Sequence, residues 1–119
     1  MIDKESGSQL TDRNQPVWRR TLDVICGKWR LFIIMKLGDQ PRRYSDLRRM
    51  IPEVSEKVLI QELKALISLG VVEKKSFGEV PPRVEYALTK NGIQALPMLG
   101  RLTDIGELFM TADEQTAVN

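Results

Sequence analysis

Histidine is absent from the sequence, and cysteine occurs once, at Cys26. Without histidine the commonest general base is missing, and the remaining candidate metal ligands are carboxylates, which are scattered along the chain rather than clustered. These absences argue against an enzyme, and they imply no metal and no cofactor. A single cysteine also forms no disulfide within the chain, which agrees with a reducing compartment.

Long apolar runs are missing as well. The longest, such as LFIIM at 31–35, are far too short to cross a bilayer, so no membrane partner is expected. The polar start MIDKESGSQLTDRNQ has no apolar segment of the secretory type, and we therefore expect a cytoplasmic protein.

What the chain does contain is typical of a globular domain. Hydrophobic residues make up 42% of its 119 positions and charged residues 29%, which suits one domain with a modest core. We expect a loose leader over 1–14, a domain over 15–110 and a flexible tail over 111–119.

Positive charge is concentrated in the first half of the chain. The formal net charge is only +2, yet residues 13–49 hold ten Lys or Arg against three Asp, which gives 10 − 3 = +7 for that segment. Such an asymmetry indicates an anionic partner for part of the surface.

Two helices are predicted ahead of a short loop at 38–41. The first is amphipathic, begins at Pro16 and stops at Gly27. Apolar residues surround most of the second, over 28–37, so this helix should run through the centre of the domain.

The next segment has the pattern of a helix-turn-helix. A short helix is predicted with Ser45 as its N-cap and Pro52 as its end, followed by the turn PEV. Ser55 should cap a longer helix that ends at Gly70, a residue suited to the left-handed conformation after a helix.

Two strands and a final helix complete the pattern. Strands are predicted over 71–76 and 84–88, joined by a loop that Pro81 and Pro82 should make stiff and projecting. Thr89 should cap a last helix, which Pro97 should kink or divide. This order is that of an α+β, mostly helical, winged helix-turn-helix domain.

The sequence resembles the HxlR-type regulators, a branch of the MarR-like winged-helix regulators of bacteria. The resemblance runs from about Pro16 to Phe109 and is carried by LDVICGKWRLFIIMKL, PRRYSDLRRMIPEVSEKVLIQELKALISLGVVEK and EVPPRVEYALTKNG. It implies a homodimer, built from the N-terminal and C-terminal helices, that binds a pseudo-palindromic DNA operator. Many members carry a cysteine before the first helix, and in some of them it is a sensor; this chain has Gln15 at that position.

Candidate DNA contacts lie on three segments. The recognition helix, about 55–69, should enter the major groove, where Gln61 can pair with adenine and Ile60 can touch a thymine methyl; the wing, about 71–88, should follow the backbone or minor groove. Arginines of the preceding segment should meet phosphates, or pair with Asp39 or Asp46. The full predicted set is Arg42, Arg43, Ser45, Arg48, Arg49, Ser55, Lys57, Ile60, Gln61, Lys64, Lys74, Lys75 and Arg83.

Arg83 has two possible roles in this scheme. It could insert into the minor groove, or it could form a structural ion pair with Glu85 or Glu79.

The terminal helices carry an apolar stripe, and we expect it to be buried against a second copy of the chain. Its predicted members are Val17, Leu22, Leu96, Leu99, Leu102, Ile105 and Phe109. A pocket between these helices and the winged domain could also take a small-molecule effector.

Cys26 has two interpretations. A neighbouring helix N-terminus and Lys28 could make it a reactive redox sensor, whereas a small buried residue closing the first helix is the interpretation we favour. Other functions considered are a winged-helix protein-interaction module that has lost DNA binding, and a thiol enzyme, which the lack of histidine disfavours.

Overall fold

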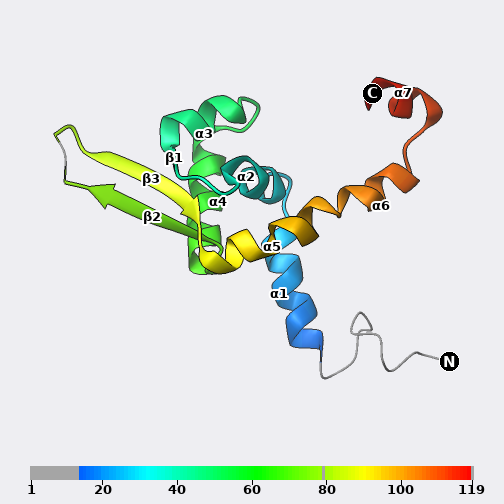
Figure 1. Ribbon diagram of the computed structural model, residues 1–119, viewed down its shortest axis with the longest axis horizontal. Coiled ribbons are helices and arrows are strands. Elements are labelled where there is room, and N and C mark those ends of the chain that lie inside the picture. Colours follow the sequence, from blue (N-terminus) through cyan, green and yellow to red (C-terminus); the bar gives the residue numbers. More distant parts are fainter. Residues whose placement is uncertain (1–13, 79, 119) are drawn as a thin grey trace.

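The computed structural model describes residues 14–78 and 80–118, and it shows a small mixed domain from which helices project (Figure 1). The elements in chain order are α1 (Gln15–Ile25), α2 (Arg30–Leu37), β1 (Arg42–Arg43), α3 (Tyr44–Met50), α4 (Glu56–Ser68), β2 (Val72–Phe77), β3 (Arg83–Leu88), α5 (Lys90–Gly100), α6 (Thr103–Leu108) and α7 (Ala112–Val118).

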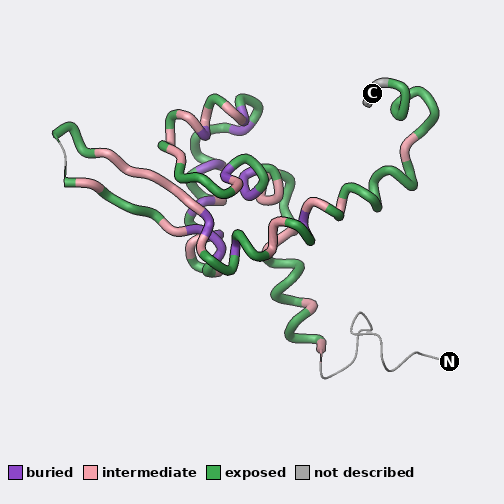
Figure 2. The backbone as a smooth tube through the Cα atoms, in the orientation of Figure 1, coloured by how far each residue is buried: buried purple, intermediate pink, exposed green. Residues whose placement is uncertain are grey.

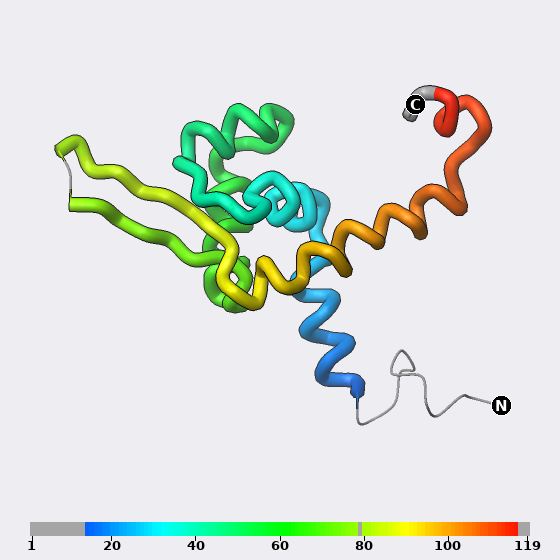
Figure 3. The backbone as a smooth tube through the Cα atoms, viewed as in Figure 1, coloured from blue at the N-terminus to red at the C-terminus, as the bar shows by residue number. Residues whose placement is uncertain are grey.

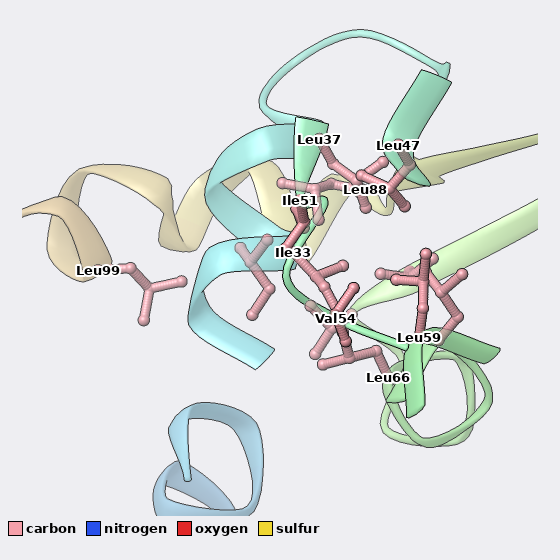
Figure 4. Packing of buried hydrophobic residues seen from close by; sticks show 13 residues of the cluster. Ile33, Leu37, Leu47, Ile51, Val54, Leu59, Leu66, Leu88 and Leu99 are labelled. Carbon is pink, nitrogen blue, oxygen red and sulfur yellow. The ribbon is translucent and has the colours of Figure 1, made fainter. Parts of the chain in front are cut away.

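The core forms around α2, as predicted from its apolar surface. Ile33, Ile34 and Leu37 of this helix are completely buried. They pack against α3, α4, the turn between them and the base of the sheet (Figure 4). One side of α2 nevertheless remains open, since Phe32 is 55% and Met35 42% exposed. The expectation of apolar packing on nearly every side of α2 is therefore met on one face only.

The sheet is antiparallel and has the strand order β1-β3-β2. The hairpin of β2 and β3 is the predicted wing, with Phe77 opposite Arg83 at its outer end. The sequence did not predict β1, which pairs Arg42 with Tyr86 and Arg43 with Glu85. Two residues are too few to show a period-two pattern, so this strand depends on tertiary pairing alone.

Most predicted helix ends are confirmed by their caps. The Ser55 hydroxyl accepts a hydrogen bond from Val58 N at 3.2 Å, and the Thr89 hydroxyl accepts one from Gly92 N at 3.1 Å. Gly70 has the expected positive φ of 81°.

Ser45, by contrast, is not an N-cap. Helix α3 begins at Tyr44 with the extended residue Arg43 in the cap position, and no side chain caps it. The prediction failed because β1 delivers the chain directly into the helix, so Ser45 already lies in the first turn.

The last helix is divided, as its proline predicted, although the break does not occur at the proline. Pro97 lies within α5, and the α-helical hydrogen-bond pattern is interrupted at Arg101 and Leu102, which keep helical φ and ψ. There, Arg101 N and Leu102 N bond to carbonyls three residues back, at 3.2 and 3.1 Å. These turns of 3₁₀ type separate α5 from α6.

The segment predicted as a flexible tail contains the helix α7, which the sequence did not predict. Thr111 and Glu114 exchange hydrogen bonds at its start: Thr111 N donates to the Glu114 carboxylate at 3.0 Å, and Glu114 N donates to the Thr111 hydroxyl at 3.2 Å. This reciprocal pair is a capping box. The predicted leader over 1–14 lies outside the described residues except for Asn14.

Burial divides the molecule into two parts (Figure 2). The buried residues cluster where α2, α3, α4 and the sheet meet, whereas α1, α6 and α7 extend away from this centre (Figure 3). The hairpin and α6 point to opposite sides (Figure 1). Over residues 14–78 and 80–118, no helix is long and apolar enough to span a membrane.

Candidate nucleic-acid interface

Helix α4 presents one apolar face to the core and one polar face to solvent. Leu59, Leu63 and Leu66 are buried, which fixes the helix on the domain. The opposite side exposes side chains that can hydrogen-bond in a DNA groove, together with one apolar residue at 36% exposure. This outward set is Glu56, Lys57, Ile60, Gln61 and Lys64.

The arginines of β1 and α3 are largely engaged within the protein. Arg42 Nε donates to the Lys36 carbonyl at 2.7 Å, and Arg48 Nη1 donates to the Val54 carbonyl at 2.5 Å. Arg49 pairs with Asp46, which resolves part of the choice left open by the sequence. Arg48 thus ties α3 to the turn before α4 and helps to fix the helix-turn-helix geometry. The remaining members of this segment, Arg43 and Ser45, are exposed.

The predicted basic residues of the wing lie on different faces of the hairpin. Lys74 is opposite Tyr86, and Lys75 is opposite Glu85. Because successive strand residues point to opposite faces, Lys74 faces the α4 side and Lys75 the other. Both lysines are exposed, and Lys75 Nζ lies 3.9 Å from Glu73 Oε1.

The side chain of Arg83, the first residue of β3, packs on other residues of the hairpin. Its Cζ atom is 4.1 Å from the centroid of the Phe77 ring, and its Nε is 3.8 Å from Glu85 Oε2. Only 30% of its side chain is exposed. This arrangement is the structural ion pair, with a cation–π contact added, that was one of its two predicted roles.

A groove of about 310 Å³ lies between α4 and the hairpin. Lys64 forms part of one wall and Lys74 part of the other, so two cations from separate elements face the same space. Tyr44 and Tyr86 also line the groove, and sequence reasoning did not assign them to the site.

Tyr44 contributes a hydroxyl group to the region of this groove. Its hydroxyl oxygen is buried and lies beside the Arg48 guanidinium. Burial raises the pKa of the Tyr44 hydroxyl; the Glu56 carboxylate acts in the same direction and the Arg48 guanidinium opposes it. A raised pKa keeps the Tyr44 hydroxyl neutral at physiological pH.

The predicted dimer residues divide by exposure. Leu99 is 9% exposed and already belongs to the core, and Leu96 and Leu102 pack partly against it. The others stay open in the single chain: Val17, Leu22, Ile105 and Phe109, of which Phe109 is 80% exposed. Helices α5 and α6 also expose three further apolar side chains: Ile93, Met98 and Leu108.

An apolar cavity of about 530 Å³ separates α1 from α5. Val17, Val24 and Ile25 line it from α1, and Met98 and Leu99 from α5. The cavity lies between two terminal helices, whereas the pocket suggested by the sequence was one between those helices and the winged domain.

Cys26 is exposed, which corrects the expectation that it is buried. It is the C-cap of α1 and has extended geometry, followed by Gly27 with φ of 106°. The chain leaves α1 at this position, and the thiol is exposed to solvent instead of closing the helix against the core. In residues 14–78 and 80–118, no group of three or more His, Cys, Asp or Glu is arranged to hold a metal.

Comparison with known proteins relates this architecture to a group of regulators. The family model described as HxlR-like helix-turn-helix matches residues 24–114. The HTH-type transcriptional regulator YkvN of Bacillus subtilis is 41% identical over 89 residues, covering 75% of each chain. YtfH of Escherichia coli, also an HTH-type transcriptional regulator, is 36% identical over 104 residues, covering 83% of this chain and 82% of YtfH.

Solved structures agree with the sequence relatives. A MarR-family transcriptional regulator of Porphyromonas gingivalis W83 matches with a TM-score of 0.73 and 41% identity, over 86% of this chain and 99% of that chain. The oxidised form of the redox regulator HypR matches with a TM-score of 0.71 and 33% identity, over 82% of this chain and 99% of that chain. With its helix-turn-helix, its wing and these relatives, the chain belongs to the HxlR-like helix-turn-helix family of transcriptional regulators.

Proposed function

We propose that this regulator acts as a homodimer on a pseudo-palindromic double-stranded DNA site, with α4 in the major groove and the hairpin on the backbone or in the minor groove. The observation that carries the proposal is the exposed face of α4 beside the groove between Lys64 and Lys74. An α-helix fits the major groove of DNA. Cations on both sides of the groove in the protein attract the phosphates of the DNA backbone.

We propose different roles for different residues of this interface. Gln61 reads a base edge, and Ile60 contacts a thymine methyl. Lys57, Lys64 and Lys74 bind phosphates, while Ser55 and the start of α4 hold a phosphate at the helix N-terminus. Arg43, Ser45, Arg49 and Lys75 contribute weaker contacts at the rim, because they are exposed but lie on other faces or are already paired.

Arg42, Arg48 and Arg83 support the interface from behind. Each is engaged by a carbonyl, a ring or a carboxylate of the protein. We propose that they hold β1, α3 and the wing in position for DNA, a role that differs from the phosphate contacts first predicted for Arg42 and Arg48.

Dimerisation is proposed to use the exposed apolar side chains of α1, α5 and α6. A surface with Leu108 at 78% and Phe109 at 80% exposure is of the kind that marks protein–protein contact. Two-fold symmetry then places two copies of α4 on half-sites about one DNA turn, roughly 34–36 Å, apart.

The test begins with selection of binding sites from random DNA by the wild-type protein. Lys57→Ala should lower the magnitude of the logarithmic salt slope by about 0.9 for each phosphate that is no longer neutralised, or about 1.8 for a dimer. Gln61→Ala should instead reduce discrimination at one base-pair position by about 1–3 kcal/mol. Lys90→Ala, an exposed lysine at the start of α5, is the control and should leave both measurements unchanged.

Failure of the wild-type protein to bind any selected DNA, even at low salt, would overturn this function. It would favour the alternative of a winged-helix module that binds another protein.

A second candidate function is redox regulation through Cys26. Its support is the exposure of the thiol, together with the similarity of the chain to redox regulator HypR. An oxidant should change DNA affinity in the wild-type protein and have no effect on Cys26→Ser. Equal oxidant responses in the two proteins would refute this role.

A further inference from the structure

Arg30 connects three helices. It is the first residue of α2, and its Nη1 donates a hydrogen bond to the backbone carbonyl of Asp23 in the last turn of α1. Its Nε donates to the Glu62 carboxylate on α4. Only 21% of the Arg30 side chain and 23% of the Glu62 side chain are exposed. One guanidinium therefore joins the end of α1 to the middle of the recognition helix.

The chemistry of this joint favours a defined geometry. The carbonyls in the last turn of a helix have no partner within the helix, and a cation there also interacts favourably with the helix dipole. The planar guanidinium binds two acceptors in fixed directions, which the single ammonium of a lysine does not. Because the pair is mostly shielded from water, salt screens it less than an exposed ion pair.

Helix α1 needs such a joint because packing holds it at one end only. Val24 and Ile25, in its last turn, pack against the core, while Val17 near its start is 65% exposed. The cavity of about 530 Å³ separates α1 from α5. Between α1 and α2 the chain passes through Gly27, whose φ of 106° suits glycine.

The length of α1 converts a small tilt into a large displacement of its far end. An eleven-residue helix such as α1 is about 16 Å long, so a tilt of about 10° at Gly27 moves its far end by about 3 Å. That displacement is close to the spacing of successive base pairs in DNA, about 3.4 Å.

We propose that Arg30 and Glu62 are positioning residues that fix the direction of α1 relative to α4 and so set the spacing between half-sites that the dimer accepts. This inference rests on the proposed function, in which α1 contributes to the dimer and α4 binds DNA. Glu62 is partly buried and its neighbour Gln61 is exposed, so the joint and the base-reading face occupy different sides of the same helix.

The first experiment measures affinity for the selected palindrome, for the same palindrome with one base pair inserted or removed between half-sites, and for a single half-site. Wild-type protein should lose about tenfold in affinity for a one-base-pair change. Glu62→Gln and Arg30→Met should reduce this loss to about threefold or less, with half-site affinity within about twofold of wild type.

Asp23→Asn is the matched control. It removes the carboxylate of Asp23 but keeps the backbone carbonyl that accepts the hydrogen bond from Arg30, so its spacing preference should equal that of wild type. Glu62→Gln preserves the shape of the side chain, so it still tests the ion pair if Arg30→Met has a folding defect. A spacing preference in Glu62→Gln as sharp as that of wild type would overturn the inference.

A second measurement does not depend on DNA. In a Cys26→Ser background, spin labels at Arg19→Cys on α1 and Lys64→Cys on α4 report the distance between the helices, with excess unlabelled protein present to isolate distances within one protomer. Arg30→Met should broaden the distance distribution, and an unchanged width would refute the joint. If wild-type protein binds no DNA, the proposed function fails, whereas the label distances still show separately whether Arg30 fixes α1.

Discussion

The winged domain and the projecting helices use similar apolar residues in opposite ways. In the winged domain, leucine and isoleucine of α2, α3 and α4 are buried around a single centre. Within the described part of the chain, α1 and α6 contain no buried residue, and Leu108 and Phe109 at the end of α6 are among the most exposed apolar side chains. The winged domain buries its core within one chain. The projecting helices present the kind of apolar surface that a partner normally covers.

This difference agrees with the different functions that we propose for the two regions. A rigid winged domain holds α4 and the hairpin in a fixed relation, which recognition of a DNA groove requires. Helices that leave the core can meet a second copy and set the distance between two such domains. The comparison also predicts that mutations in the two regions affect different measurements.

The largest effect is expected from the core. Leu66→Ala removes a completely buried side chain of α4 and should lower the free energy of unfolding by about 2–5 kcal/mol, because the cavity left behind adds to the lost burial. Urea denaturation measures the change. Leu108→Ala is the matched control in the projecting region, and in dilute, monomeric protein it should cost less than about 0.5 kcal/mol. Equal losses would remove the distinction between the regions.

A smaller effect is expected where α5 joins the winged domain. A Cβ atom at Gly92 would lie 2.5 Å from the Val71 carbonyl oxygen and 3.2 Å from Leu88 Cβ. Gly92→Ala should therefore push α5 away from the sheet and destabilise the fold by about 1–3 kcal/mol. Gly106→Ala is the control, because a Cβ there meets nothing within 4 Å. Thermal unfolding of both variants tests this, and equal midpoints would contradict it.

The smallest effect concerns two serines on either side of the helix-turn-helix turn. Ser55→Ala removes the cap of α4 and should cost about 1 kcal/mol. Ser45→Ala should be within about 0.5 kcal/mol of wild type, because Ser45 caps nothing in α3. A larger loss for Ser45→Ala than for Ser55→Ala would reverse the assignment of the caps.

Local signals in the sequence predicted much of the winged domain. The spacing of Leu59, Leu63 and Leu66 defined the buried face of α4, and the Ser55 and Thr89 caps were correct because both signals act within one helical turn. The order of elements indicated the winged helix-turn-helix before any comparison. The polar face of α4 could also be predicted, since exposure follows directly from helical period.

Features that depend on distant residues were not predictable in this way. The strand β1 exists through its pairing with β3, and the burial of Arg83 depends on the Phe77 ring across the hairpin. Cys26 is exposed because the chain turns at Gly27, which composition does not reveal. The contact of Arg30 with Glu62 spans 32 positions, and no periodicity links residues so far apart.

The central claim is that two copies of this chain act together through the helices that leave the core. Sedimentation equilibrium of the full-length protein at micromolar concentration tests it most directly. The account predicts the mass of two chains, with dissociation promoted by Phe109→Glu and not by Lys90→Ala. A wild-type protein that sediments as one chain at this concentration would contradict it.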